Sequence, residues 1–281
     1  MQTILPCHGS SQPYIFWERR TALKPSILIL ATLAILLAAQ CAFAEEREEQ
    51  PPLSFKLSTG AYSKYLLEAG NLAYDGPVVQ TDLTLFFNKP PIKGAYFNVW
   101  WSAGFDDSNL NSNYGDEVDY TVGWAGEVKG FTLDIGVSLF EMYRIGSLKG
   151  DIIHPYLEVG RPFHLSPQHT LTPFFKVTGV SFLPDEEGDR PDGALRMFLG
   201  AKHLWSITPG FSISQRAYVL HDEGACGRDS GFIGRYFAGF EKSIAKGLSF
   251  NAGITVSSPI THLDDDRKTE VVYGGGLVFR F

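Results

Sequence analysis

The chain has 281 residues, a formal net charge of −7 and 14% aromatic residues. An acidic chain of this kind is a poor binder of nucleic acid, so we expect no nucleic-acid partner. Cys7 and Cys41 lie in an N-terminal leader, which leaves Cys226 alone in the mature chain and excludes both an intramolecular disulfide and a cysteine-based metal site.

Residues 1–44 have the pattern of a cleaved signal peptide. Arg19, Arg20 and Lys24 precede an apolar run, residues 27–39, whose length of about thirteen residues suits a signal-peptide core rather than a transmembrane helix. Small residues at Ala42 and Ala44 predict cleavage after Ala44. Residues 45–52 then form a periplasmic stub, and the mature chain has 21 Lys+Arg against 30 Asp+Glu, a net charge of −9.

Two other interpretations of this leader are weaker. A lipid anchor at Cys41 requires a small residue directly before it, and Gln40 stands there. The Arg19-Arg20 pair suggests twin-arginine export, but that route carries folded proteins, whereas a membrane barrel folds only on reaching lipid. The long stretch before Arg19 leaves the true start codon open.

From residue 53 onward, apolar residues alternate with small or polar ones at a period of two, as in residues 131–139 and 248–256. Segments of about 11 to 14 residues are long enough to cross a bilayer at a tilt. We therefore predict an all-β, transmembrane, antiparallel up-and-down β-barrel over residues 53–281, with twelve strands and with ten or fourteen as alternatives. The strands are expected near residues 53–65, 77–88, 95–105, 117–128, 130–142, 152–162, 169–182, 194–206, 210–220, 231–242, 247–257 and 270–281.

The links between these segments distinguish a barrel from a soluble β-sandwich, which also alternates. Five links are short, at residues 89–94, 129–130, 164–168, 208–210 and 246–247, and the six between them are longer. The longer links are acidic, with Asp106-Asp107, residues 185–187, Asp222-Glu223 and residues 264–266. Outer-membrane barrels have short periplasmic turns and long external loops, so this pattern predicts a barrel with both termini in the periplasm.

The chain ends on an aromatic strand. Tyr273, Leu277, Phe279 and the terminal Phe281 fall on one face of it, although Gly275 interrupts the pattern. This resembles the β-signal read by the barrel-assembly machinery, which we expect as a partner during biogenesis. Lipid and lipopolysaccharide of the bacterial outer membrane are the other expected partners.

Three stretches, residues 77–83, 94–100 and 116–136, resemble the TorF-type porins, a group of conserved hypothetical outer-membrane proteins. The resemblance covers roughly a hundred residues of the N-terminal half. It departs from the family pattern at Lys64-Tyr65, where an Arg-Gly pair is expected. The resemblance implies an outer-membrane β-barrel and does not identify a solute.

Parity places charged residues inside the barrel, on two different walls. The acidic wall comprises Glu117, Asp119, Glu127, Asp134 and Glu158. The basic wall comprises Lys176, Arg196, Lys202, Arg216 and Arg235. Opposed walls would create a transverse field that favours polar solutes, whereas internal salt bridging is the simpler alternative.

A twelve-stranded lumen lies between filled and open barrels in size, so its side chains decide whether it conducts. Small interior residues such as Ser102, Gly123, Gly136 and Gly276 favour an open or partly open pore. Interior aromatic residues could instead fill it or offer a stacking surface, namely Trp100, Phe174, Phe198 and Phe237. Aromatic residues near strand ends predict an interfacial girdle, namely Tyr65, Phe105, Trp205 and Tyr273.

Enzymatic activity and metal binding have little support. His154 is the one histidine placed well inside a strand pattern, and no serine beside it belongs to a nucleophile motif. His262 with residues 264–266 lacks the glycine and distal glutamate of a calcium loop. We therefore predict a channel for passive diffusion of small polar solutes, without a cofactor. A non-conducting surface barrel and a lipid-modifying enzyme are the alternatives.

Overall fold

A computed structural model describes residues 51–105, 117–141, 151–183, 193–225 and 228–281. The predicted signal peptide, most of the stub, Cys226 and the acidic residues 106–107 and 185–187 lie outside these ranges. Within them, no helix is long and apolar enough to span a membrane.

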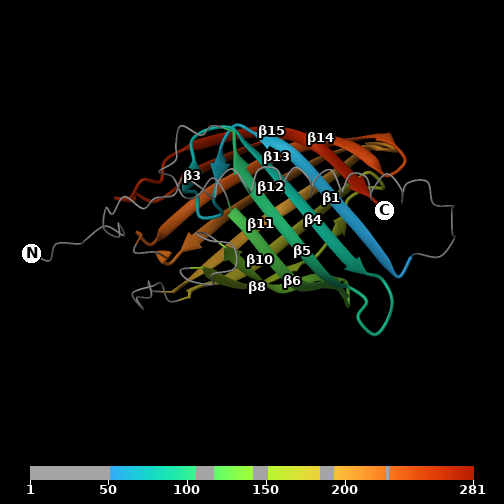
Figure 1. Ribbon diagram of the computed structural model, residues 1–281, viewed down its shortest axis with the longest axis horizontal. Coiled ribbons are helices and arrows are strands. Elements are labelled where there is room, and N and C mark those ends of the chain that lie inside the picture. Colours follow the sequence, from blue (N-terminus) through green and yellow to red (C-terminus); the bar gives the residue numbers. More distant parts are fainter. Residues whose placement is uncertain (1–50, 106–116, 142–150, 184–192, 226–227) are drawn as a thin grey trace, which may run out of the picture. The chain divides into compact units, whose positions relative to one another are not determined.

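Twelve long strands pair in antiparallel order around a closed ring (Figure 1). Each strand pairs with the next long strand along the chain, and β15 pairs with β1 to close the ring. The short β9 (Phe163–His164) extends the β10 pairing, and β2 (Tyr65–Leu66) with β3 (Leu72–Tyr74) forms a separate hairpin. The twelve barrel strands are β1 (Leu53–Tyr62), β4 (Val78–Phe87), β5 (Ala95–Gly104), β6 (Glu117–Val128), β7 (Phe131–Glu141), β8 (Ile152–Gly160), β10 (His169–Phe182), β11 (Ala194–Thr208), β12 (Phe211–Asp222), β13 (Gly231–Ala245), β14 (Leu248–Pro259) and β15 (Glu270–Arg280).

All twelve predicted segments are strands of this ring, which confirms the predicted fold class and strand number. The first segment, predicted to reach Tyr65, ends as β1 at Tyr62, where the chain turns away from the ring. The tenth, predicted to end at residue 242, continues as β13 to Ala245. The prediction of Tyr65 as a girdle residue is therefore wrong, because Tyr65 belongs to the β2–β3 hairpin.

The short turns follow from their residue types. Lys129 and Gly130 both have positive φ, 52° and 79°, which a two-residue hairpin turn needs in order to match the twist of its strands. The turns into β12 and β14 end at Gly210 and Gly247, both with positive φ, and each follows a register shift in the strand before it. Tight connections of this kind fix the register of neighbouring strands.

The outer face of the ring is apolar. Large apolar side chains alternate outward along the strands and stay exposed, to 60% at Val122 and 70% at Leu199. Others are Ile135, Val219, Tyr236, Ile254 and Leu277. A continuous surface of this kind suits a hydrocarbon surrounding rather than water.

The inner face carries polar and charged residues among its aromatic ones. Register and alternation turn one charged, polar or glycine residue inward from each of the twelve strands. These are Ser58, Asp82, Asn98, Thr121, Asp134, Glu158, Lys176, Lys202, Arg216, Gly239, Asn251 and Gly276. Two of the three buried apolar clusters include residues of the β1–β4 link, such as Ala69 and Tyr65. The apolar packing inside the barrel therefore accompanies that link.

Candidate functional site

The β1–β4 link, residues 63–77, folds into the barrel as a hairpin that we call the lumen hairpin. Its β2–β3 pair follows the Tyr62 end of β1 and precedes the Val78 end of β4. The Tyr65 hydroxyl donates a hydrogen bond of 2.6 Å to the buried Glu117 carboxylate of β6. The Tyr65 ring also contacts the Trp100 ring of β5, with centroids 5.4 Å apart. Burial and the neighbouring Glu117 raise the pKa of Tyr65 well above its usual value, so its hydroxyl stays protonated and donates.

The opposite side of the lumen hairpin contacts the basic wall. Lys176 Nζ lies 2.6 Å from Glu68 Oε1, and Arg235 donates a hydrogen bond of 2.5 Å to the Leu67 carbonyl. Burial alone would raise the pKa of Glu68, but the charge and hydrogen bond of Lys176 and the charges of His154 and Arg196 lower it to about 2. Glu68 is therefore ionised at neutral pH, and two residues of the predicted basic wall hold the hairpin.

The tip of the lumen hairpin fits closely against β13 and β14. Gly70 has a φ of +84°, and a Cβ placed there would lie 3.2 Å from Ile233 and 3.3 Å from the Ser257 hydroxyl. The preceding Ala69 is buried with Phe198 and Leu220. Glycine is required at this tip both for its backbone conformation and for the close approach.

Ion pairs also connect the lumen hairpin and the β14–β15 link to neighbouring strand ends, which we call the rim. Lys64 pairs with Asp75 at 2.8 Å and with Glu270 at 3.0 Å, and these hydrogen bonds raise the pKa of Lys64. The buried Arg267 pairs with Asp222 at 3.2 Å and with Asp265, which ties the β14–β15 link to β12. Arg196, predicted as a lumen residue, also lies beside Asp222, at 3.6 Å. Arg196 therefore takes part in the rim network.

Away from the lumen hairpin, two cations of the predicted basic wall pair with a carboxylate. Glu158 of β8 pairs with Lys202 and, at 3.1 Å, with Arg216. Both cations also lie over the Phe174 ring, at 5.2 Å and 4.6 Å from its centroid. The assignment of Glu158 to a separate acidic wall is thus corrected, because β8 adjoins β10 in the ring and its carboxylate faces the cations of β11 and β12.

The acidic residues Asp82, Asp134 and Glu117 bind uncharged side chains. Asp134 accepts hydrogen bonds from Tyr96 at 2.8 Å and Tyr156 at 3.3 Å. Asp82 of β4, which the sequence analysis did not select, accepts from Asn98 at 2.9 Å and Thr84 at 3.2 Å. In the part of the chain that the structure describes, no cation lies within salt-bridge distance of Asp82 or Asp134. The same holds for Glu117 and Asp119, which are adjacent inward positions of β6. Glu127, also predicted for this wall, is exposed at the end of β6 beside the Lys129-Gly130 turn.

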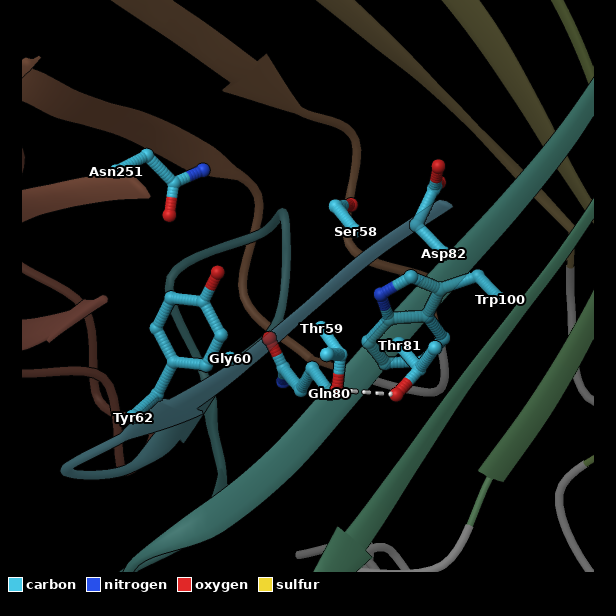
Figure 2. A pocket seen from close by; sticks show the side chains of 9 residues that line it. All are labelled: Ser58, Thr59, Gly60, Tyr62, Gln80, Thr81, Asp82, Trp100 and Asn251. Atoms are coloured by element: carbon cyan, nitrogen blue, oxygen red, sulfur yellow. Dashed lines mark hydrogen bonds between the residues drawn. The ribbon is translucent and has the colours of Figure 1, made fainter. Parts of the chain in front are cut away.

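A small polar cavity lies in the wall formed by β14, β1, β4 and β5. Its volume is about 50 Å³, and it is lined by Ser58, Tyr62, Gln80, Asp82, Trp100 and Asn251 among others. Figure 2 shows Tyr62 and Asn251 on one side of it and Trp100 and Asp82 on the other (Figure 2). Trp100 lies inside the barrel as predicted. The cavity could not be predicted, because Asn251 of β14 meets β1, β4 and β5 only when the ring closes.

His154 is buried on the inner face of β8, beside the Phe140 ring. Ser138 lies opposite it in register, but the Ser138 hydroxyl shares a 2.6 Å hydrogen bond with Thr121. Within the described ranges, Nε2 of His154 has no hydrogen-bond partner. This geometry differs from a Ser-His catalytic pair, in which the two side chains are hydrogen-bonded. The absence of enzymatic activity stays a prediction.

The last strand closes the ring. Tyr273, Leu277 and Phe279 alternate along β15, and Phe281 follows its end. β15 pairs with β14 on one side and β1 on the other, with Tyr273 and Leu277 exposed on the outer face. Their role as an assembly signal stays a prediction.

No protein-family model and no curated protein sequence matches the chain. Solved structures share its fold. The NanC porin is 10% identical, with 80% of this chain and 98% of that chain covered, at a TM-score of 0.51. An outer-membrane channel from Pseudomonas putida F1 is 11% identical, with 85% and 100% covered, at a TM-score of 0.50. A bacterial polysaccharide outer-membrane secretin is 9% identical, with 83% and 100% covered, at a TM-score of 0.51. The fold is therefore that of the outer-membrane β-barrel channels.

Proposed function

We propose that this protein is an outer-membrane channel through which small polar solutes diffuse along a charged lumen. The observation that carries this proposal is the inner face, where ten of the twelve strands turn a charged or polar side chain inward and β13 and β15 turn Gly239 and Gly276 inward. An apolar exterior around a polar interior is the arrangement of a water-filled barrel in a membrane.

The distribution of charge supports selection by polarity. Among the described residues, Asp82 of β4 and Asp134 of β7 have no cation within salt-bridge distance, whereas Lys202 and Arg216 on β11 and β12 share the carboxylate of Glu158. The two sides of the lumen therefore carry opposite excess charge. Such a transverse field orders water and dipolar solutes and disfavours apolar ones.

The lumen hairpin supports a narrow pore. It contacts the inner faces of β5, β6, β10 and β13, so it crosses much of the lumen near the end with the longer links. A hairpin held in this way would limit the size of the solute that passes. It also keeps the non-conducting barrel as a second candidate, because a hairpin that never leaves a clear path would close the pore.

The N-terminal features complete the proposal. The leader at residues 1–44 supports export to the bacterial outer membrane, with cleavage after Ala44. Residues 77–83 and 94–100, which carry the resemblance to the TorF-type porins, fall on β4 and β5 and their flanks. They support a place in that porin group. The barrel-assembly machinery and outer-membrane lipid remain the proposed partners.

Planar-bilayer recording from the purified protein tests the channel. We expect stepwise currents, with a reversal potential in a salt gradient that moves toward cation preference in Lys202→Gln and toward anion preference in Asp134→Asn. A matched control is Ser214→Ala on the inner face of β12, which removes no charge. A folded protein that carries no current would exclude the channel and leave the non-conducting barrel. Equal reversal potentials in the two charge variants would exclude selection by the charged walls.

A further inference from the structure

The cavity of Figure 2 gathers polar side chains from four strands of the lumen wall. Several other inner polar groups bind one another, as Glu158 binds Lys202 and Arg216. Among the described residues, by contrast, no hydrogen bond reaches the side chains of Ser58, Gln80 or Asn251. Two amides and a hydroxyl therefore line the cavity with donors and acceptors that a polar solute can bind.

Asp82 gives the cavity a fixed acceptor. Asn98 and Thr84 each donate a hydrogen bond to one of its carboxylate oxygens, at 2.9 Å and 3.2 Å, and hold the group in place. Each oxygen has further capacity to accept, and hydrogen bonds to an ionised carboxylate are strong. Because no cation within the described ranges pairs with Asp82, the cavity carries a negative charge that repels anionic solutes.

Aromatic rings stand on both sides of these polar groups. Tyr62 lies against the β15 backbone, where a Cβ on Gly274 would come within 2.3 Å of its ring, and the Trp100 indole packs against Tyr65. Both rings are therefore held in place by their neighbours. Such rings offer apolar faces to the apolar side of a solute while the amides and the carboxylate take its hydroxyl groups.

The volume sets the size of what enters. A cavity of about 50 Å³ holds roughly three water-sized groups. That is one hydroxylated edge of a sugar ring, with the ring itself remaining in the lumen. We propose that this cavity is a subsite of the channel for the hydroxyl groups of an uncharged saccharide, held by Asn251, Gln80 and Asp82 between the Tyr62 and Trp100 rings.

This inference rests on the proposed channel function, so the test uses two readouts. Maltose is the neutral probe, and lactobionate is an anionic disaccharide of similar size. In planar bilayers carrying the full-length protein, maltose should interrupt the ion current in a concentration-dependent way and lactobionate should not. Saturation-transfer NMR of the detergent-folded protein measures maltose binding without requiring any current.

The variants identify the cavity. Asn251→Ala and Gln80→Ala should each weaken maltose binding about two- to tenfold, the effect of one lost hydrogen bond, whereas Ser214→Ala elsewhere on the inner wall should leave it unchanged. Asp82→Asn keeps the shape and removes the charge, so lactobionate should then bind. Current without maltose interruption or NMR binding overturns the subsite and leaves the channel standing. Maltose binding without current supports the subsite and overturns the channel. Equal maltose affinity in Asn251→Ala, Gln80→Ala and Ser214→Ala overturns the assignment to this cavity.

Discussion

At the scale of single residues, a few contacts decide where the lumen hairpin lies. Glu68 reaches Lys176, Tyr65 reaches Glu117, and Gly70 allows the tip to approach Ile233. Each contact joins the hairpin to a different strand, so together they fix its position across the lumen. Among these contacts, the one between Glu68 and Lys176 is an ion pair, so acidification can test it by removing the charge of Glu68.

We predict that acid releases the lumen hairpin. Burial raises the pKa of Glu68, but Lys176, His154 and Arg196 outweigh this effect and lower the pKa from 4.5 to about 2. A lowered folded-state pKa means that the ion pair contributes its full stability above about pH 4.5 and loses it as the pH falls toward about 2. Single-channel conductance should stay constant from neutral pH to about pH 5 and rise in the more acidic range.

Glu68→Gln provides the control for this prediction, because it removes the titrating group and keeps the size of the side chain. Its conductance should be higher at neutral pH and should change less with acidification. If the wild type and Glu68→Gln give the same pH profile, other carboxylates cause the effect and the role assigned to Glu68 is wrong.

At the scale of one strand, the alternation of faces determines which substitutions are tolerated. On β6, Val122 points outward and is 60% exposed, while the neighbouring Thr121 points inward and is hydrogen-bonded to Ser138. Two positions that are adjacent in the sequence therefore face hydrocarbon and lumen.

We expect Val122→Lys to lower the free energy of unfolding by about 2–4 kcal/mol, because it places a charge in the hydrocarbon. Thr121→Lys should lower it by only about 1 kcal/mol, the contribution of the lost hydrogen bond, since the ammonium group can stay in the lumen. Urea titration of the protein in lipid vesicles, followed by tryptophan fluorescence, measures both. Equal losses would contradict the assignment of the two faces of β6.

At the scale of the whole barrel, closure of the ring does not depend on the lumen hairpin. β1 and β4 pair directly from Leu53↔Phe87 to Tyr62↔Val78, and the hairpin leaves and re-enters the ring between Tyr62 and Val78. The neighbouring ends of these two strands could be joined by a much shorter link.

Replacing residues 64–76 by a short Gly-Ser link should therefore leave a folded barrel whose single-channel conductance is several times higher. The lumen would then lose the chain that crosses it, while all twelve strand pairs remain. Heat-modifiable migration on gels reports folding, and planar-bilayer recording reports conductance. A folded deletion variant with unchanged conductance would show that the hairpin does not limit the pore.

The sequence by itself determined where the strands lie and which face of each points outward. Side chains alternate between hydrocarbon and lumen along a strand, so apolar and polar residues alternate with a period of two. The twelve segments and the inward position of Trp100 and Lys202 could therefore be predicted from short stretches of sequence. Short glycine turns such as Lys129-Gly130 likewise specify their own geometry.

Only the tertiary structure decided what the inward residues meet. Glu158 and Lys202 are 44 positions apart, and Arg235 lies 168 positions from the Leu67 carbonyl that it binds. The path of the lumen hairpin and the cavity between β14 and β5 also arise from contacts between distant segments. Such contacts depend on how the ring closes and on where a long link finds partners, and the local alternation of residues specifies neither.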